Sequence, residues 1–212
     1  MYIEKDFEYN GHTIPYLIDY PDDYSPDKKY PIIVYLHGYG FVFSDIQKLK
    51  DECPLQRNRI PSNTTSCILI APKCSEINWL FHFESLSAFF DYIVKLPCCD
   101  PSRLYLCGTS MGAYTSWIVL MAKQNFFAAA VICCGGGPYW GSQFFTNTPI
   151  RLVHGKKDPT VLFRESEIMA SRINEKGGKV ELIAHENLTH NVWTVTFTNP
   201  DTYQWLFSHK KA

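Results

Sequence analysis

One serine of this chain lies in a sequence that suits a nucleophile. Ser110 stands between two glycines in the stretch Gly108–Gly112, with a short apolar run before it and a helix-like segment after it. In this G-x-S-x-G arrangement the serine occupies a very tight strand-to-helix turn, and glycines are needed because the flanking backbone segments approach closely. The pattern predicts a hydroxyl exposed at a strand end, beside the unpaired N–H groups of a helix start.

A serine hydroxyl is a poor nucleophile until a base takes its proton. The histidines are residues 12, 37, 82, 154, 185, 190 and 209. Where such a turn carries the nucleophile, the acid and then the histidine follow it along the chain. His185 and His190 both follow the last apolar run, Val180–Ala184. Because His190 lies further out on the loop, we favour it as the base, with His185 as the alternative.

Asp158 is the candidate for the acid that orients the histidine. It is the only carboxylate in the turn that follows the apolar run Ile150–Val153. A carboxylate at this place would stabilise the imidazolium that forms during the reaction. An aspartate before proline also suits a helix N-cap, and the two roles are compatible. Glu165 and Glu167 are interpreted as solvated residues on a helix face.

The oxyanion of such a reaction needs two backbone N–H donors. One is expected from Met111, directly after the nucleophile. The other is expected from Tyr39, in the loop that follows the apolar run Ile32–Leu36. His37 and His154 each precede a glycine at the end of a predicted strand, and we interpret both as structural residues that support the loops.

The elements that must position these residues alternate along the chain. Predicted strands are Ile3–Tyr9, Thr13–Tyr20, Ile32–Leu36, Cys67–Ala71, Leu104–Cys107, Ala128–Cys133, Ile150–Val153 and Val180–Ala184. Predicted helices are Ser85–Leu96, Ser110–Lys123, Val161–Glu175 and a last one from residue 199 or 200 to Ser208. Runs that are apolar on both faces, alternating with helices, indicate a doubly wound, mostly parallel sheet. The Asn10–Gly11 pair predicts an antiparallel hairpin ahead of it.

Size and charge limit the classes of function. The 212 residues suit one domain, 1–212, and the segment Gly135–Pro149 is too short for a cap domain. A net charge of −1 with no basic cluster argues against nucleic acid and anionic membranes as partners. The N-terminus lacks the apolar stretch of a signal peptide.

The eight cysteines do not have the spacing of a metal site. None forms a C-x-x-C pair, and the adjacent pairs at 98–99 and 133–134 suit a disulfide framework poorly. Several lie in apolar runs, where a free thiol behaves as a small hydrophobe. We therefore expect a cytoplasmic protein without a bound metal, and the inferred chemistry needs no cofactor.

Several stretches resemble a known family. They are PIIVYLHGYG, ILIAPKC, DPSRLYLCGTSMGAYTSW, FFAAAVICCGGG, PIRLVHGKKDPTV and HNVWTVTFTNPDTYQWLFSHKK, from about Tyr30 to the C-terminus. They are similar to small serine esterases of the α/β-hydrolase superfamily that group with feruloyl esterases and polyhydroxybutyrate depolymerases, some of them described as predicted peptidases. The resemblance implies the α/β-hydrolase fold, a Ser110, Asp158 and His190 triad, and an oxyanion hole at Tyr39 and Met111.

The expected activity is hydrolysis of carboxylic esters, of short-chain or aryl (hydroxycinnamoyl) type, through an acyl-enzyme. Aromatic residues near strand ends, which suit a flat apolar group, are the candidates for substrate binding: Trp79, Tyr139, Trp140 and Trp193. A peptidase, thioesterase or acyltransferase would use the same triad. An inactive binding module of this fold is a more remote alternative. The sequence does not determine the oligomeric state.

Overall fold

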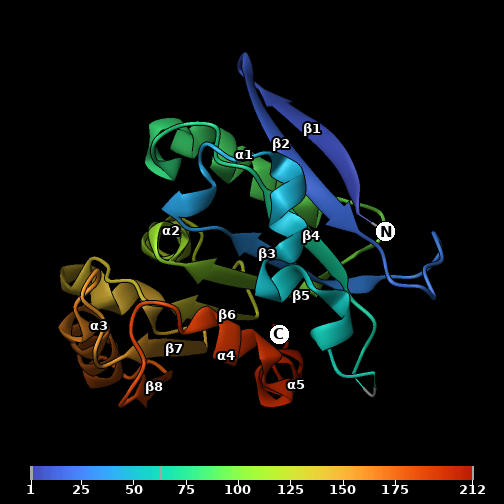
Figure 1. The fold of residues 1–212 in the computed structure, drawn as a ribbon. Coiled ribbons are helices and arrows are strands. Elements are labelled where there is room, and N and C mark those ends of the chain that lie inside the picture. The colour runs from blue at the N-terminus through green and yellow to red at the C-terminus, as the bar shows by residue number, and fades with distance from the viewer. Residues whose placement is uncertain (1, 63, 212) are drawn as a thin grey trace.

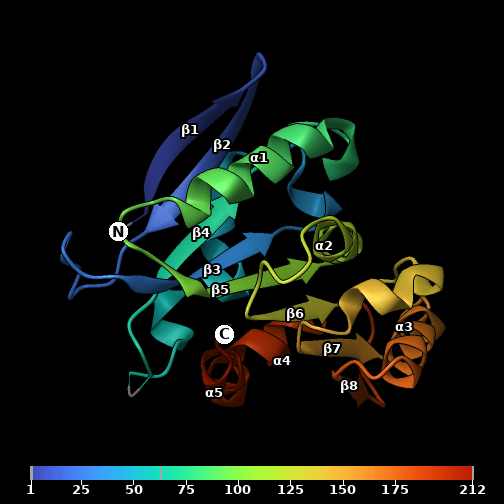
Figure 2. The ribbon, with the colours of Figure 1, turned by 180° about the vertical axis from the view of Figure 1, so that it is seen from behind.

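A computed structural model of the protein describes residues 2–62 and 64–211, without the side chain of Cys53. Eight strands in this part of the chain form a sheet with the order β1-β2-β4-β3-β5-β6-β7-β8. Figures 1 and 2 show it twisting from the N-terminal hairpin at one end to β8 at the other. The strands are β1 (Ile3–Tyr9), β2 (His12–Asp19), β3 (Tyr30–Leu36), β4 (Ile68–Pro72), β5 (Cys99–Thr109), β6 (Ala129–Cys133), β7 (Ile150–Gly155) and β8 (Val180–His185).

The strand directions confirm the predicted doubly wound sheet with a leading hairpin. Asn10 and Gly11 have φ values of 50° and 79°, as a two-residue hairpin turn requires, and Tyr9 pairs with His12. Strand β2 also pairs antiparallel with β4, whereas the pairs from β4 through to β8 are parallel. The carboxyl ends of the parallel strands therefore share one edge of the sheet.

Helices cover both faces of the sheet. They are α1 (Phe83–Val94), α2 (Met111–Ala122), α3 (Phe163–Glu175), α4 (Trp193–Thr198) and α5 (Pro200–Ser208). Short 3-10 helices are η1 (Tyr39–Phe41), η2 (Ile46–Asp51), η3 (Cys53–Leu55), η4 (Arg57–Arg59), η5 (Trp79–His82) and η6 (Tyr139–Phe145). The connection between β6 and β7 holds η6 and no larger insertion.

Alternation along the strands divides the core into two layers. In β3, Val34 packs in the layer that contains residues of α1, α2 and α3, such as Trp117. Its neighbour Tyr35 packs in the opposite layer with residues of α4 and α5, such as Phe197. Because successive side chains of a strand point to opposite faces, a strand buried on both sides must be apolar throughout, as β3 is.

Helix α4 was not among the predicted helices. Its sequence, WTVTFT, is rich in β-branched residues, which are poor helix formers. Threonine hydroxyls compensate locally: Thr196 donates to the Val192 carbonyl at 2.8 Å and Thr198 to the Thr194 carbonyl at 2.7 Å. Burial of Phe197 holds the short helix against the sheet, which is tertiary packing that local propensity does not reveal.

Cysteines in the described part of the chain are buried like the small hydrophobic residues that the sequence analysis expected. Cys67, Cys74, Cys98, Cys99, Cys107 and Cys134 are buried thiols outside any disulfide, whereas the side chain of Cys53 lies outside the described residues. Among the helices that the structure describes, none has the length and hydrophobicity that a membrane span requires.

Gly112 marks the closest approach between α2 and the sheet. A Cβ atom at this position would overlap the carbonyl oxygen of Leu36 at the end of β3. The overlapping atoms belong to the backbone of a central strand, which cannot move aside without breaking the sheet. The start of α2 is therefore fixed against β3 only when residue 112 has no side chain.

We predict that Gly112→Ala lowers the free energy of unfolding by about 3 kcal/mol or more, since overpacking against backbone is strongly destabilising. Thermal and urea unfolding would measure the change. Gly40→Ala is the matched control, because a Cβ there meets nothing within 4 Å, and it should shift stability by about 0.5 kcal/mol or less. Equal stability of the two variants would contradict the close approach.

Candidate functional site

The backbone at Ser110 adopts the strained turn that the glycine spacing predicts. Ser110 has φ 51° and ψ −116° at the junction of β5 and α2, a conformation that non-glycine residues rarely adopt. A Cβ on Gly108 would come within 2.6 Å of the Gly112 carbonyl oxygen. The Ser110 N–H donates to the Cys133 carbonyl oxygen at 2.9 Å. The turn thus holds the serine at the carboxyl edge of the sheet.

Three side chains that are distant in sequence meet at this edge. Nε2 of His190 lies 2.9 Å from Oγ of Ser110. Nδ1 of His190 lies 2.7 Å from Oδ2 of Asp158. Because an ionised carboxylate only accepts hydrogen bonds, Nδ1 carries the hydrogen and Nε2 is left to accept the serine proton. The structure therefore brings together the three residues predicted as nucleophile, base and acid.

The carboxylate of Asp158 is buried and bound on both oxygens. Oδ1 accepts the backbone N–H groups of Thr160 and Val161 at 2.8 and 2.9 Å. Burial alone would raise the pKa of Asp158, but the hydrogen bonds from His190 and these two N–H groups hold the pKa below its ordinary value. The group is an anion at neutral pH, suited to stabilise an imidazolium.

The helix-cap interpretation of Asp158 needs correction. Helix α3 begins at Phe163 with Leu162 in the cap position, two residues later than predicted. Asp158 instead closes a turn ahead of the helix by binding the N–H groups two and three residues on. Glu165 and Glu167 lie exposed on α3, as expected.

The other candidate base, His185, lies elsewhere. It ends β8, where it pairs with Gly155 of β7. It is His190, five residues further along the loop, whose imidazole reaches Ser110. The loop after β8 therefore provides the histidine that the order along the chain favoured.

The two expected oxyanion donors both start helices beside the nucleophile. Met111 is the first residue of α2 and Tyr39 is the first residue of η1. First-turn N–H groups have no acceptor within their own helix. A Cβ on Gly38 would lie 3.4 Å from Cβ of Ser110, so the loop after β3 rests against the serine. This placement suits the predicted oxyanion hole.

The loop after β3 is supported by a buried neutral histidine. Nδ1 of His37 lies 2.8 Å from the Gly38 carbonyl oxygen, and Nε2 accepts the N–H of Cys74 at 3.0 Å. Burial lowers the pKa of His37 to about 4. The ring is therefore uncharged, and it connects the loop after β3 to the loop after β4, as a structural role requires.

Two further residues brace this loop. Lys73 is buried, and its Nζ donates to the Val42 carbonyl at 2.6 Å and to its neighbour Cys74 at 3.0 Å. The indole N–H of Trp79 donates to the His37 carbonyl at 3.2 Å. At 4% exposure Trp79 is part of the core, so its side chain offers almost no surface to the substrate that the sequence analysis assigned to it. The sequence signalled no role for Lys73, since a lysine after a strand is usually solvated.

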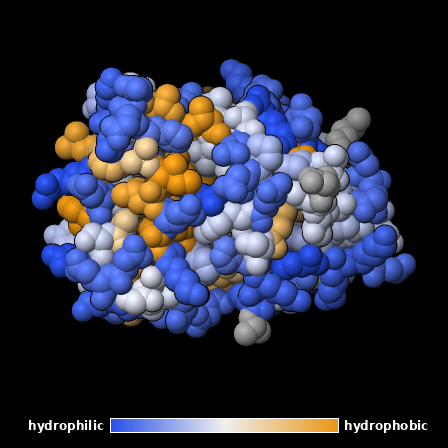
Figure 3. Space-filling view, turned by 90° about the horizontal axis from the view of Figure 1, so that it is seen from below, coloured by the Kyte–Doolittle hydropathy of each residue, from blue (hydrophilic) through white to orange (hydrophobic). Residues whose placement is uncertain are grey.

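The other aromatic candidates are accessible. Tyr139 and Trp140 are 52% and 69% exposed, and the ring of Trp193 meets His190 edge to face at 5.5 Å. Most exposed large hydrophobic residues follow the carboxyl ends of parallel strands or lie on the first turn of α2: Tyr39, Phe43, Ile77, Leu80, Phe81, Tyr114, Tyr139, Trp140, Leu162 and Val195. Figure 3 shows hydrophobic residues gathered toward one end of a mostly hydrophilic face. The ten exposed residues named above, as their positions along the chain define them, are called the apolar rim.

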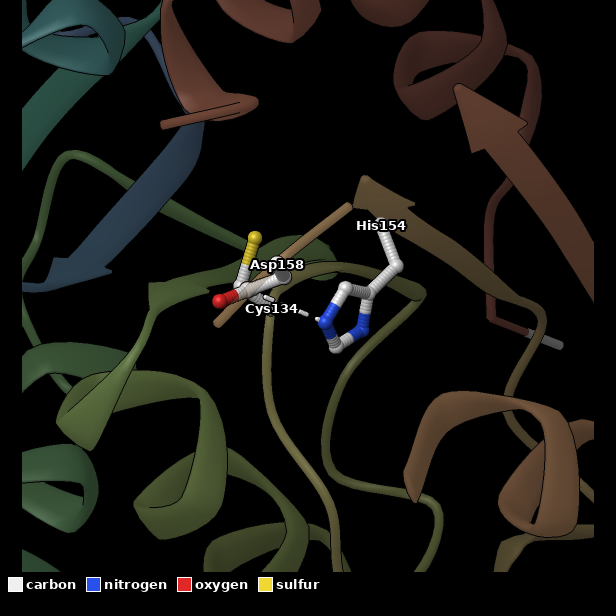
Figure 4. A group of neighbouring side chains, drawn as sticks. All are labelled: Cys134, His154 and Asp158. Carbon is white, nitrogen blue, oxygen red and sulfur yellow. Dashed lines mark hydrogen bonds and ion pairs between the residues drawn. The ribbon is translucent and has the colours of Figure 1, made fainter. Parts of the chain in front are cut away.

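One group of side chains in the described residues has atoms that metals bind. Cys134, His154 and Asp158 place a thiol, an imidazole and a carboxylate within 4.8 Å of one another (Figure 4). Their atoms already have partners: Sγ of Cys134 donates to the His190 carbonyl at 2.9 Å, and both oxygens of Asp158 are bound. The group serves to support the loops that carry Asp158 and His190.

Comparison with solved structures gives several related folds. A thermostable esterase aligns with a TM-score of 0.83 and 28% identity over 99% of this chain and 63% of that protein. Est1E from Butyrivibrio proteoclasticus aligns with a TM-score of 0.73 and 12% identity over 97% of this chain and 98% of its own. Porphyromonas gingivalis dipeptidyl peptidase 4 aligns with a TM-score of 0.74 and 13% identity over 98% of this chain and 35% of its own.

The chain thus spans 63% of the length of the thermostable esterase. Neither the protein-family models nor the curated protein sequences gave a match. The sheet order, the hairpin, the strained turn after β5 and the similarity to these structures agree with one another. The chain therefore has the α/β-hydrolase fold.

Proposed function

We propose that this protein is a serine esterase that cleaves carboxylic esters through an acyl-enzyme. The observation that carries the proposal is the continuous contact from Ser110 Oγ to His190 Nε2 and from His190 Nδ1 to Asp158, on a strained strand-to-helix turn. A serine held in this way has a base to take its proton and an anion to stabilise that base. The 28% identity to a thermostable esterase favours esters as the substrate class.

In the first half of the reaction, Oγ of Ser110 attacks the ester carbonyl carbon while His190 Nε2 takes the hydroxyl proton. The carbonyl oxygen becomes negative and is bound by the N–H groups of Met111 and Tyr39. His190 then gives its proton to the departing alkoxide, which leaves as the alcohol. In the second half, water attacks the acyl-enzyme with the same proton transfers, releasing the acid and restoring the serine.

The surroundings of the site favour an apolar acyl or aryl group. The residues of the apolar rim follow the carboxyl ends of the parallel strands or lie on the first turn of α2, and Tyr139 and Trp140 in the connection from β6 to β7 are open to solvent. Aromatic rings bind flat apolar groups by dispersion and by removal of their surfaces from water. Aryl esters, including hydroxycinnamoyl esters, are therefore the proposed preference over acetyl esters, with Tyr139, Trp140 and Trp193 as the binding residues.

The triad is tested with a p-nitrophenyl ester series, acetate to octanoate, and a methyl hydroxycinnamate. Ser110→Ala and His190→Ala should lower kcat by about ten-thousandfold, since removal of a triad member leaves only binding and the oxyanion hole. His185→Ala is the matched control, and we expect its turnover to be close to that of the unmodified protein.

Two further measurements separate the alternatives. A serine-directed fluorophosphonate should label the unmodified protein and not Ser110→Ala. A matched anilide should be turned over far more slowly than the corresponding ester, and comparable rates would identify a peptidase instead. A folded protein that is inert on all of these esters and unlabelled would refute the proposed function and favour a binding module.

We predict that Trp140→Ala raises KM for the hydroxycinnamate by roughly fivefold to thirtyfold, the loss expected for part of one aromatic contact of about 1 to 2 kcal/mol. Acetyl ester kinetics should change little, because an acetyl group offers little apolar surface for the indole of Trp140 to cover. At 69% exposure the indole contributes little to the core, so the melting temperature should be retained. An equal effect on both esters would argue against a substrate-binding role.

A further inference from the structure

The acid of the proposed triad contacts a second histidine. Oδ2 of Asp158 accepts from Nδ1 of His190 at 2.7 Å and lies 3.2 Å from Nε2 of His154. His154 is fully buried at the end of β7, and Figure 4 shows its ring directed at the aspartate. The esterase mechanism proposed above assigns no step to this second imidazole. The contact between His154 and Asp158 is therefore not explained by the proposed reaction steps.

The partners of His154 identify its tautomer. Nε2 faces two groups that can only accept, the Val161 carbonyl oxygen at 2.9 Å and Asp158 Oδ2 at 3.2 Å, so Nε2 carries a hydrogen. Nδ1 lies 2.6 Å from the hydroxyl of Ser166 on α3. A neutral ring that donates from Nε2 and accepts from Ser166 satisfies both nitrogens without a second buried charge.

The shared hydrogen restrains the carboxylate at the oxygen that His190 uses. Backbone N–H groups already hold Oδ1. With His154 at Oδ2, both oxygens of the carboxylate are held by donors, which fixes its plane. Part of the negative charge on Oδ2 is then neutralised by the His154 N–H rather than by His190. Both effects act on His190 through Asp158, since the polar contacts of the His154 ring go to Ser166, Asp158 and Val161.

We propose that His154 is a positioning residue that holds Asp158 in the plane needed by His190 and moderates how strongly Asp158 stabilises the His190 imidazolium. The proposal rests on the esterase function proposed above. It assigns different tasks to two histidines on one carboxylate: His190 exchanges the proton, whereas His154 keeps its own.

Other titratable groups near the carboxylate remain unchanged in the tests below. The thiol of Cys134, at the end of β6, is buried, and burial raises its pKa to about 12. Tyr114 of α2 interacts electrostatically with both Asp158 and Glu165 of α3, and burial raises its pKa. Both groups are uncharged at neutral pH. A shift in the acidic limb of the rate profile can then be attributed to the contact between His154 and Asp158.

The test compares His154→Phe, which retains a ring but has no N–H, with His154→Gln, whose amide nitrogen can donate from nearly the same place. We expect His154→Phe to lose about tenfold or more in kcat/KM, since small misplacements of catalytic groups are costly. Its acidic limb should move up by roughly half to one pH unit, because the charge on Oδ2 then acts on His190 alone. His154→Gln should stay within about threefold, with its limb unmoved.

Phe163→Leu is the packing control, because its ring meets that of His154 at 5.8 Å without a polar contact. It should lower stability with no change in the pH profile. Equal losses in the Phe and Gln variants with an unmoved limb would show a merely structural role and overturn the proposal. Normal kinetics of a folded His154→Phe protein would overturn it as well.

A measurement on the unmodified protein needs neither activity nor a folded variant. Nitrogen NMR of the histidine rings should show His154 as the neutral Nε2–H tautomer at neutral pH. Finding His154 as the Nδ1–H tautomer, or charged, at this pH would overturn the proposal. If the protein cleaves no ester, the proposed function fails by the assays above, whereas the NMR result separately tests whether His154 donates from Nε2 to Asp158.

Discussion

A buried carboxylate is the constraint around which this site is built. Asp158 has no exposed side-chain surface, so its charge must be balanced by hydrogen-bond donors. Two come from the backbone directly after it, which fixes the turn between β7 and α3. A third comes from His190, which fixes the loop after β8. The hydrogen bonds that the buried carboxylate requires therefore determine the positions of the turn after β7 and of the loop after β8. The loop after β8 in turn places the His190 imidazole relative to Ser110.

The parallel sheet makes this arrangement possible. Ser110, Asp158 and His190 follow β5, β7 and β8, whose carboxyl ends share one edge. Behind the serine, Thr109 donates its hydroxyl hydrogen to Tyr35, and Tyr35 donates to the Glu52 carboxylate at 2.6 Å. This buried chain ties the turn to the layer beneath the sheet. The strained backbone conformation of Ser110 is thus maintained by the close backbone contact between Gly108 and Gly112 and by the hydrogen bonds of the Thr109 hydroxyl.

The sequence predicted correctly those features that are determined by residues close together in the chain, and missed those that depend on contacts between distant residues. The Ser110 turn and the Asn10–Gly11 hairpin follow from glycine spacing, a local steric requirement, and were placed correctly. Helix α4 could not be predicted, because its stability comes from packing and threonine hydroxyl bonds. Trp79 was assigned by its position after a strand, but which way an indole points depends on neighbours that are distant in sequence, here His37.

The two His-Gly pairs at strand ends, which the sequence analysis interpreted as loop supports, achieve this support by the same physical means. His37 after β3 and His154 at the end of β7 are both fully buried, and each has a ring nitrogen bonded to the backbone of another loop segment. A neutral imidazole offers one donor and one acceptor on a rigid ring, so it can join two backbone segments without introducing charge. The glycine that follows allows the backbone to pass close by. At Gly155, a Cβ would overlap the Leu188 carbonyl in the loop before His190. One His-Gly pair thus supports the loop after β3 and the other supports the turn after β7, which is the structural role that their position before a glycine at a strand end predicts.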